Sequence, residues 1–125
     1  MHLRTKHGTN VMVDFPVLQV SFYKSSSGSE PVREWLKSLE RDEKKAIGED
    51  IKTVQFGWPL GMPLVRKLDG NLWEIRVNLD NKIARILFTA KGNQMILLHG
   101  FVKKSQKTPK NDLERAKKRR DEVLA

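Results

Sequence analysis

The chain has 125 residues, the usual size of one domain, which leaves little room for a second. With 24 Lys and Arg against 15 Asp and Glu, its net charge of +9 favours nucleic acid as a partner. A membrane surface is less favoured, because the basic residues are not organised around one long apolar helical face. It has no cysteine, which excludes disulfides and thiolate metal sites. It also has no apolar run long enough for a signal peptide or a membrane span, so we expect a soluble cytoplasmic protein.

The first fifteen residues predict an irregular N-terminal extension, because polar and basic side chains alternate there with few apolar ones. Residues 16–125 are predicted to form a single domain. It starts at Pro16 and continues into VLQVSFY, residues 17–23, a β-branched and aromatic run that is typical of a strand. The serine-rich segment KSSSGSE, residues 24–30, predicts the loop that ends this strand.

Two helices are predicted next, packed as an αα-hairpin. The first has Ser29 as its N-cap and Pro31 in its first turn. Its apolar side consists of Val32, Trp35, Leu36 and Leu39. The second follows Asp42 and ends at Gly57. Its apolar residues at helical spacing are Ala46, Ile47, Ile51 and Val54.

An antiparallel meander of three strands follows a glycine- and proline-rich loop, GWPLGMPLVRKLDGN. In LWEIRVNL, residues 72–79, polar and apolar residues alternate, so Glu74 and Arg76 share the side opposite Ile75 and Val77. IARILFTA, residues 83–90, and QMILLHGFV, residues 94–102, return as the next two strands after short turns. We expect one face of this sheet to be open to solvent.

A basic helix is predicted to close the chain, with Thr108 as N-cap and Pro109 in its first turn. Its thin apolar stripe consists of Leu113, Ala116, Val123 and Leu124. From residue 103 to residue 125 there are nine basic residues against four acidic ones, which is more than half of the net charge. The predicted fold class is therefore α+β, in the order β, α, α, β, β, β, α.

The predicted sheet brings several cations within reach of one another. Arg76 lies on the polar side of its strand, and Arg85 interrupts an apolar strand. Lys103, Lys104 and Lys107 follow the last strand. A buried arginine needs a carboxylate, an open surface or a phosphate, whose oxygens match the guanidinium fork. A cross-strand pair of Arg85 with Glu74 on a solvated sheet face remains an alternative.

His99 has a side chain suited to proton transfer near neutral pH. By strand alternation it shares a face with Leu97, Phe101 and Lys103, although a lone strand histidine is more often a packed, hydrogen-bonded residue. Phe101, next to the lysines, is a candidate for stacking on a base. The sequence shows no metal-ligand spacing, phosphate-binding glycine loop or nucleophilic triad.

The segments LWEIRVN, ARILF and especially FVKKSQKTPKNDLERAKKR resemble toxins of type II toxin–antitoxin systems. They are most similar to the phage-derived Gp49-like, HigB-type branch of the RelE/ParE superfamily, from about Val17 to the C-terminus. The resemblance implies a RelE-like fold and a ribosome-dependent mRNA endonuclease that uses no metal or other cofactor. It also implies inhibition by a cognate helix-turn-helix, HigA-like antitoxin, which would be the protein's only link to operator DNA.

By the same resemblance, Arg85 matches the strand arginine that members use near the phosphate, and Arg76 matches the basic position of the preceding strand. Lys103 and Lys107 match lysines of the terminal motif. Lys67 and Lys104 are further expected RNA contacts. Relatives place a tyrosine, or a glutamate with a histidine, at the reaction centre, whereas this chain has only Tyr23, on its first strand. That leaves His99 or a lysine for proton transfer.

Two alternatives to the nuclease remain open. A ParE-like gyrase poison would act by binding protein, and a noncatalytic nucleic-acid-binding module would need only the basic surface.

Overall fold

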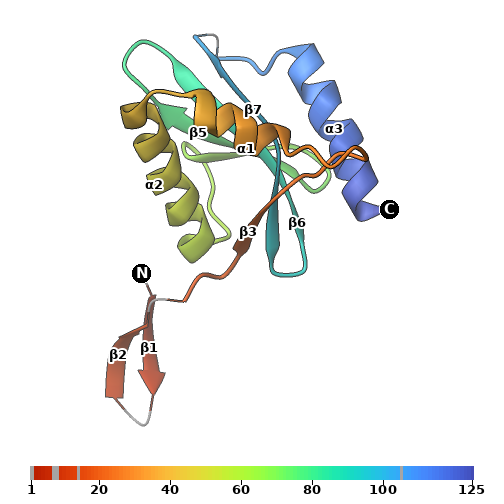
Figure 1. Cartoon of the computed structure of the whole chain (residues 1–125). Coiled ribbons are helices and arrows are strands. Elements are labelled where there is room, and N and C mark those ends of the chain that lie inside the picture. Colours follow the sequence, from red (N-terminus) through yellow and green to blue (C-terminus); the bar gives the residue numbers. More distant parts are fainter. Residues whose placement is uncertain (1, 7–8, 14, 105) are drawn as a thin grey trace.

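The computed structural model describes residues 2–6, 9–13, 15–104 and 106–125, with side chains from residue 15 onward. Its centre is an open, mixed five-stranded sheet in the order β3-β7-β6-β5-β4 (Figure 1). The strands are β3 (Gln19–Phe22), β4 (Val65–Asp69), β5 (Leu72–Asn78), β6 (Ile83–Lys91) and β7 (Gln94–Lys103). The helices are α1 (Pro31–Ser38), α2 (Arg41–Gly57) and α3 (Lys110–Leu124). The α+β class is confirmed.

The N-terminal extension differs from the irregular segment that we expected. Two strands, β1 (His2–Lys6) and β2 (Thr9–Val13), pair antiparallel and form a separate two-stranded sheet. Backbone pairing between neighbouring segments supplies these hydrogen bonds without a strongly apolar sequence. The alternation of polar residues therefore does not exclude a hairpin.

Strand β4 was missed because it lies inside the glycine- and proline-rich segment predicted as loop. It pairs antiparallel with β5, with Val65 opposite Ile75 and Arg66 opposite Glu74. An edge strand needs hydrogen-bond partners on one side only and tolerates charged residues there. The four residues that follow Val65 therefore extend the sheet even though prolines precede them.

Strand β3 pairs in parallel with β7, which makes the sheet mixed, and the expected antiparallel meander of β5, β6 and β7 is confirmed. Helix α1 begins at Pro31 as predicted, but its N-cap residue is Glu30 rather than Ser29. Helix α2 begins at Arg41 behind a capping box formed by Glu40 and Glu43. None of the described helices combines the length and the apolar character needed to cross a bilayer.

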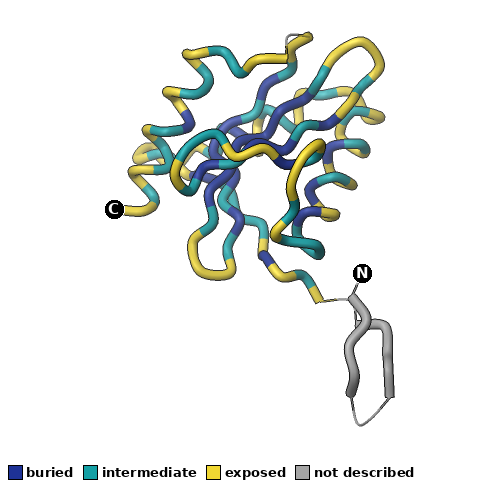
Figure 2. Tube along the Cα trace, turned by 180° about the vertical axis from the view of Figure 1, so that it is seen from behind, coloured by how far each residue is buried: buried dark blue, intermediate teal, exposed yellow. Residues whose placement is uncertain are grey.

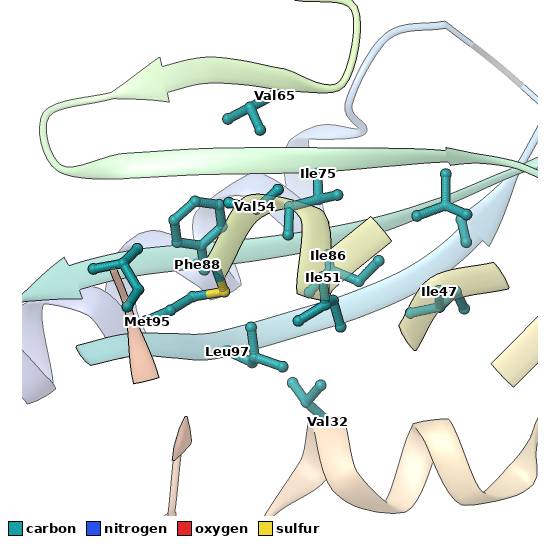
Figure 3. Close-up of a cluster of buried hydrophobic side chains, with 13 residues drawn as sticks. Val32, Ile47, Ile51, Val54, Val65, Ile75, Ile86, Phe88, Met95 and Leu97 are labelled. Carbon is teal, nitrogen blue, oxygen red and sulfur yellow. The ribbon is translucent and has the colours of Figure 1, made fainter. Parts of the chain in front are cut away.

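The main core lies between one face of the sheet and the helices α1 and α2. Figure 3 shows Val32 of α1 and Ile47 and Ile51 of α2 directed toward Ile86 and Leu97 of the central strands. These side chains are almost completely buried, and removing their apolar surface from water is the main stabilising contribution. The predicted apolar faces of both helices are therefore correct.

The other face of the sheet is not open to solvent, contrary to our expectation. Helix α3 covers it, with Ala116 completely buried and Leu113 and Val123 packed against Leu87 and Leu98 of the sheet. Figure 2 shows that the central strands are buried along most of their length. We call this the α3 face of the sheet.

A β-bulge in β7 changes which side chains reach the α3 face. Leu87 of β6 lies opposite His99, while the next residue, Phe88, lies opposite Leu97, so Leu98 is the extra residue. Leu97 belongs to the main core and Leu98 to the cluster under α3. His99 therefore does not share a face with Leu97 as alternation predicted, although it does lie beside Phe101.

Candidate functional site

Two arginines form the centre of the candidate site. Arg76 of β5 and Arg85 of β6 are direct cross-strand partners, so their side chains leave the sheet on the same side. The Arg85 side chain is 0% exposed, whereas 14% of the Arg76 side chain is exposed. Arg76 is thus the arginine of this pair that reaches solvent, while Arg85 lies beneath the surface.

A buried glutamate lies between the two guanidinium groups. Glu74 Oε2 is 3.8 Å from Nη1 of Arg85, and Glu74 Oε1 is 3.9 Å from Nε of Arg76. The Glu74 side chain is fully buried, and its Oε1 accepts no hydrogen bond from the described residues. The predicted pairing of Arg85 with Glu74 is therefore present, but it is buried rather than on a solvated face.

Thr108 connects this cluster to the loop before α3. Its hydroxyl donates to Oε2 of Glu74 at 2.6 Å and accepts from Nη1 of Arg85 at 3.5 Å. Helix α3 starts at Lys110 with Pro109 as its N-cap residue, without a side-chain capping hydrogen bond. Thr108 is therefore not the cap that we predicted. It stabilises the position of the loop over the arginines.

Above this buried cluster lies an exposed basic surface. Nη2 of Arg76 donates to Oε1 of Gln106 at 2.6 Å, and Lys103, Lys104 and Lys107, which are within three residues of that glutamine in the sequence, are exposed. The structure thus brings Arg76 and the three predicted lysines to one end of the sheet. We call Arg76, Lys103, Lys104 and Lys107 the loop surface.

Lys67, a predicted RNA contact, does not belong to the loop surface. It is opposite Trp73, and its ammonium lies 6.0 Å from the Trp73 ring centre, on the α1 and α2 side of the sheet. Arg66, exposed and opposite Glu74, is the β4 residue on the arginine side. The sequence did not indicate Arg66 as a site residue. Alternation shows on which side of the sheet Arg66 lies, but only after β4 is known to be a strand.

The electrostatic surroundings of Arg85 have opposing effects. Burial lowers the pKa of the Arg85 guanidinium, and Arg76 and Arg66 lower it further, while Glu74 and Asp112 act in the opposite direction. An arginine nevertheless remains protonated in proteins. An additional anion near this group, such as a phosphate, is therefore electrostatically favoured.

His99 lies beneath α3 and is only 8% exposed. Its Nε2 is 2.6 Å from Oδ1 of Asp112, and its ring centre is 5.5 Å from that of Phe101. Burial lowers the pKa of His99, although the hydrogen bond to Asp112 opposes this effect. The packed, hydrogen-bonded role is thus the one that the geometry supports. Phe101 is buried in the same cluster and is not open to a base.

Tyr23, the only tyrosine, follows β3 and contacts the C-terminal half of α3. Its hydroxyl donates to Glu122, which raises the pKa of the phenol, and Arg119 lies 5.1 Å from its ring centre. The arginine pair instead contacts the loop before that helix. Tyr23 therefore does not supply a tyrosine to the arginine site.

Among the residues that the structure describes, no three His, Asp or Glu side chains are grouped so as to hold a metal ion. The candidate site is instead built from guanidinium and ammonium groups, whose natural ligands are carboxylates and phosphates.

Comparison with protein families assigns this chain to one of them. The family model described as phage derived protein Gp49-like (DUF891) matches residues 34–121, which is more than half of the chain and includes β4 to β7 and most of α3. No curated protein sequence matches this chain. The matched range contains Glu74, Arg76, Arg85 and the loop surface.

Proposed function

Because the chain belongs to the phage-derived Gp49-like family, we propose that it is the toxin of a type II toxin–antitoxin module, of the HigB-type branch of the RelE/ParE superfamily. Family membership indicates a toxin-like phage-derived protein. The activity that we propose is ribosome-dependent cleavage of mRNA, which stops translation in the cytoplasm. A RelE-like fold is part of the same proposal.

The observation that carries this proposal is the position of Arg76. It lies at the surface between the buried Glu74 and Arg85 on one side and the exposed lysines 103, 104 and 107 on the other. A guanidinium backed by a second arginine can bind two oxygens of one phosphate. The lysines supply further contacts along an RNA backbone, whose charge dominates affinity.

The chemistry requires charge stabilisation and two proton transfers. The ribose 2′-hydroxyl loses its proton to solvent water as its oxygen attacks the adjacent phosphorus. The bond to the 5′-oxygen breaks, that oxygen takes up a proton, and the products carry a 2′,3′-cyclic phosphate and a 5′-hydroxyl. Arg76 would stabilise the extra negative charge on the phosphate, with Arg85 behind it. We assign protonation of the leaving 5′-oxygen to Lys103 or Lys107, because these ammonium groups are exposed and His99 is not.

The partners follow from the proposed class. A cognate HigA-like antitoxin with a helix-turn-helix domain would hold the toxin inactive and would connect it to operator DNA. The mRNA substrate would be presented by the ribosome. The net charge of +9 supports association with ribosomal RNA.

A second candidate function is noncatalytic binding of nucleic acid. The burial of Arg85 and His99 favours it, because neither side chain can touch a substrate in this arrangement. Such a module would need only the loop surface. Its affinity would decline in small steps as single lysines are removed.

Primer extension on a defined mRNA, with and without translating ribosomes, distinguishes these functions. The proposed nuclease gives cuts only on translating ribosomes, and Arg76→Ala abolishes them. Binding without cuts supports the noncatalytic module. Intact mRNA together with inhibited DNA gyrase would instead identify a ParE-like poison.

A further inference from the structure

We propose that Glu74 is a positioning residue, which holds the guanidinium groups of Arg76 and Arg85 side by side so that Arg76 binds an RNA phosphate in a fixed orientation. This inference rests on the proposed function for the identity of the ligand. The orientation of Arg76 is a property of the free protein and is measured separately.

The need for such a residue follows from the strand register. Arg76 and Arg85 are direct cross-strand partners, and like charges in that position repel each other. Glu74 precedes Arg76 by two residues on β5, so its side chain leaves the same face of the sheet. Its two carboxylate oxygens face different arginines, with Oε1 toward Arg76 and Oε2 toward Arg85. The carboxylate therefore offsets the repulsion within the pair.

The geometry differs from that of a salt bridge that serves stability alone. A strong arginine–carboxylate pair has N to O distances near 2.8 Å, often with two parallel hydrogen bonds. Here the distances are 3.8 Å to Arg85 and 3.9 Å to Arg76, and Oε1 of the buried carboxylate lacks a hydrogen bond from the described residues. Burying a carboxylate in this way costs stability. The contact of the Glu74 carboxylate with both arginines accounts for the presence of a buried glutamate at this position.

Two further contacts fix the arrangement. Thr108 donates a hydrogen bond to Oε2 of Glu74 at 2.6 Å, which holds the carboxylate from the side of the loop. Gln106, two residues earlier, accepts from Nη2 of Arg76 at 2.6 Å. The same loop therefore contacts both the Glu74 carboxylate and Arg76, the arginine that reaches solvent.

The first measurement reads the orientation of Arg76 without RNA. Side-chain Nε–Hε signals of arginine in NMR spectra report how fast each guanidinium proton exchanges with water, and Arg76→Ala assigns the Arg76 signal by its loss. We expect Glu74→Gln, which keeps the shape but removes the charge, to speed exchange of the Arg76 proton several-fold. Arg33, an exposed arginine on α1, is the internal reference for the exchange rate of an arginine that does not contact Glu74. An unchanged Arg76 signal in folded Glu74→Gln overturns the proposal.

The second measurement uses binding of a short single-stranded RNA with 2′-O-methyl riboses, which cannot be cleaved. Simple charge removal predicts tighter binding for Glu74→Gln, because RNA is negatively charged. Positioning predicts the opposite, namely several-fold weaker binding and a salt dependence shallower by about 0.7 in log–log slope, the loss of one phosphate contact. Glu74→Asp, which keeps the charge, should recover part of the loss. The matched control Glu114→Gln removes an exposed carboxylate of α3 and should bind slightly more tightly.

These outcomes separate the two proposals. If Arg76→Ala binds RNA weakly but Glu74→Gln binds it as tightly as the wild type or more tightly, the proposed role of Glu74 is overturned. Unchanged binding by Arg76→Ala overturns the RNA surface of the proposed function, and the exchange rates then still decide whether Glu74 orients the arginine. If Glu74→Gln does not fold, Thr108→Val removes the donor to Oε2 and should cause the same changes to a smaller extent. Wild-type exchange and binding in Thr108→Val would then overturn the proposal.

Discussion

Arg76 and Arg85 face each other across two adjacent strands, yet the side chain of Arg85 is completely buried and that of Arg76 reaches the surface. Sequence reasoning gave both arginines the same role near a phosphate. The structure separates them, because the loop that carries Thr108 covers Arg85. Their substitutions should therefore have different consequences.

Arg85→Ala should destabilise the fold far more than Arg76→Ala. It leaves the buried carboxylate of Glu74 without one of its two cations, which costs about 3 kcal/mol for a buried pair. Arg76→Ala also takes one cation from Glu74, but the Arg76 guanidinium reaches the surface and water can take its place, so we expect a smaller loss of about 1 kcal/mol. Urea unfolding followed by circular dichroism measures both. Equal stabilities of the two variants would contradict the buried position of Arg85.

Gly100→Ala should be strongly destabilising, because a β-carbon at this position of β7 would lie 2.3 Å from the ring of Trp35. Relieving that contact requires the tryptophan to move out of the core, which costs about 2 kcal/mol or more. Gly48→Ala is the matched control, since a β-carbon there meets no atom within 4 Å. Its better helix propensity should stabilise α2 by about 1 kcal/mol. Thermal unfolding of both variants tests this contrast.

Stability should fall as the pH is lowered below about 6.5, in part because of His99. Burial lowers the pKa of His99 in the folded protein, so the unfolded chain binds the proton more readily and the contribution of neutral His99 is lost as the pH falls toward the folded pKa. His99→Gln should make the free energy of unfolding less dependent on pH between 7.5 and 5.5. Urea unfolding at both pH values gives the difference. A His99→Gln variant with the same pH dependence as the wild type would show that His99 does not contribute.

Arg120 should attach the C-terminal part of α3 to the turn between β4 and β5. It donates to Oδ2 of Asp69 at 2.6 Å and to the carbonyl of Gly70 at 2.7 Å. We expect Arg120→Ala to lose about 1 kcal/mol, because Asp69 is partly exposed and solvent weakens the pair. Lys118→Ala, at an exposed position on the same helix, should change stability little. Hydrogen exchange in α3 would show whether the loss is local.

The sequence predicted the elements whose apolar period is long and regular. Helix α1 from Pro31, helix α2 with Ile47 and Ile51 inside, and strands β5 and β6 were all found in this way. The pairing of Glu74 with Arg85 also followed from alternation in neighbouring antiparallel strands. These features depend on local patterns, which a single sequence contains.

Features that depend on tertiary contacts were missed. The bulge at Leu98 changes the face of His99, and no residue type marks it in the run MILLHGFV. The coverage of the α3 face depends on where a thin apolar stripe around Ala116 packs. Thr108 resembles a helix cap in sequence, but its hydroxyl contacts Glu74 across the molecule. The edge strand β4 was predicted as loop because of its composition, so the position of Arg66 on the sheet was missed as well.

The measurement that tests the central claim most directly is analysis of RNA ends after incubation of an mRNA with translating ribosomes and purified protein. The account predicts fragments with 2′,3′-cyclic phosphate and 5′-hydroxyl ends for the wild type and for Lys45→Ala, an exposed control on α2. It predicts at least a 100-fold slower reaction for Arg76→Ala, in the range found when one oxyanion donor is removed. Cleavage by Arg76→Ala at the wild-type rate, or no cleavage by folded wild-type protein, would contradict it.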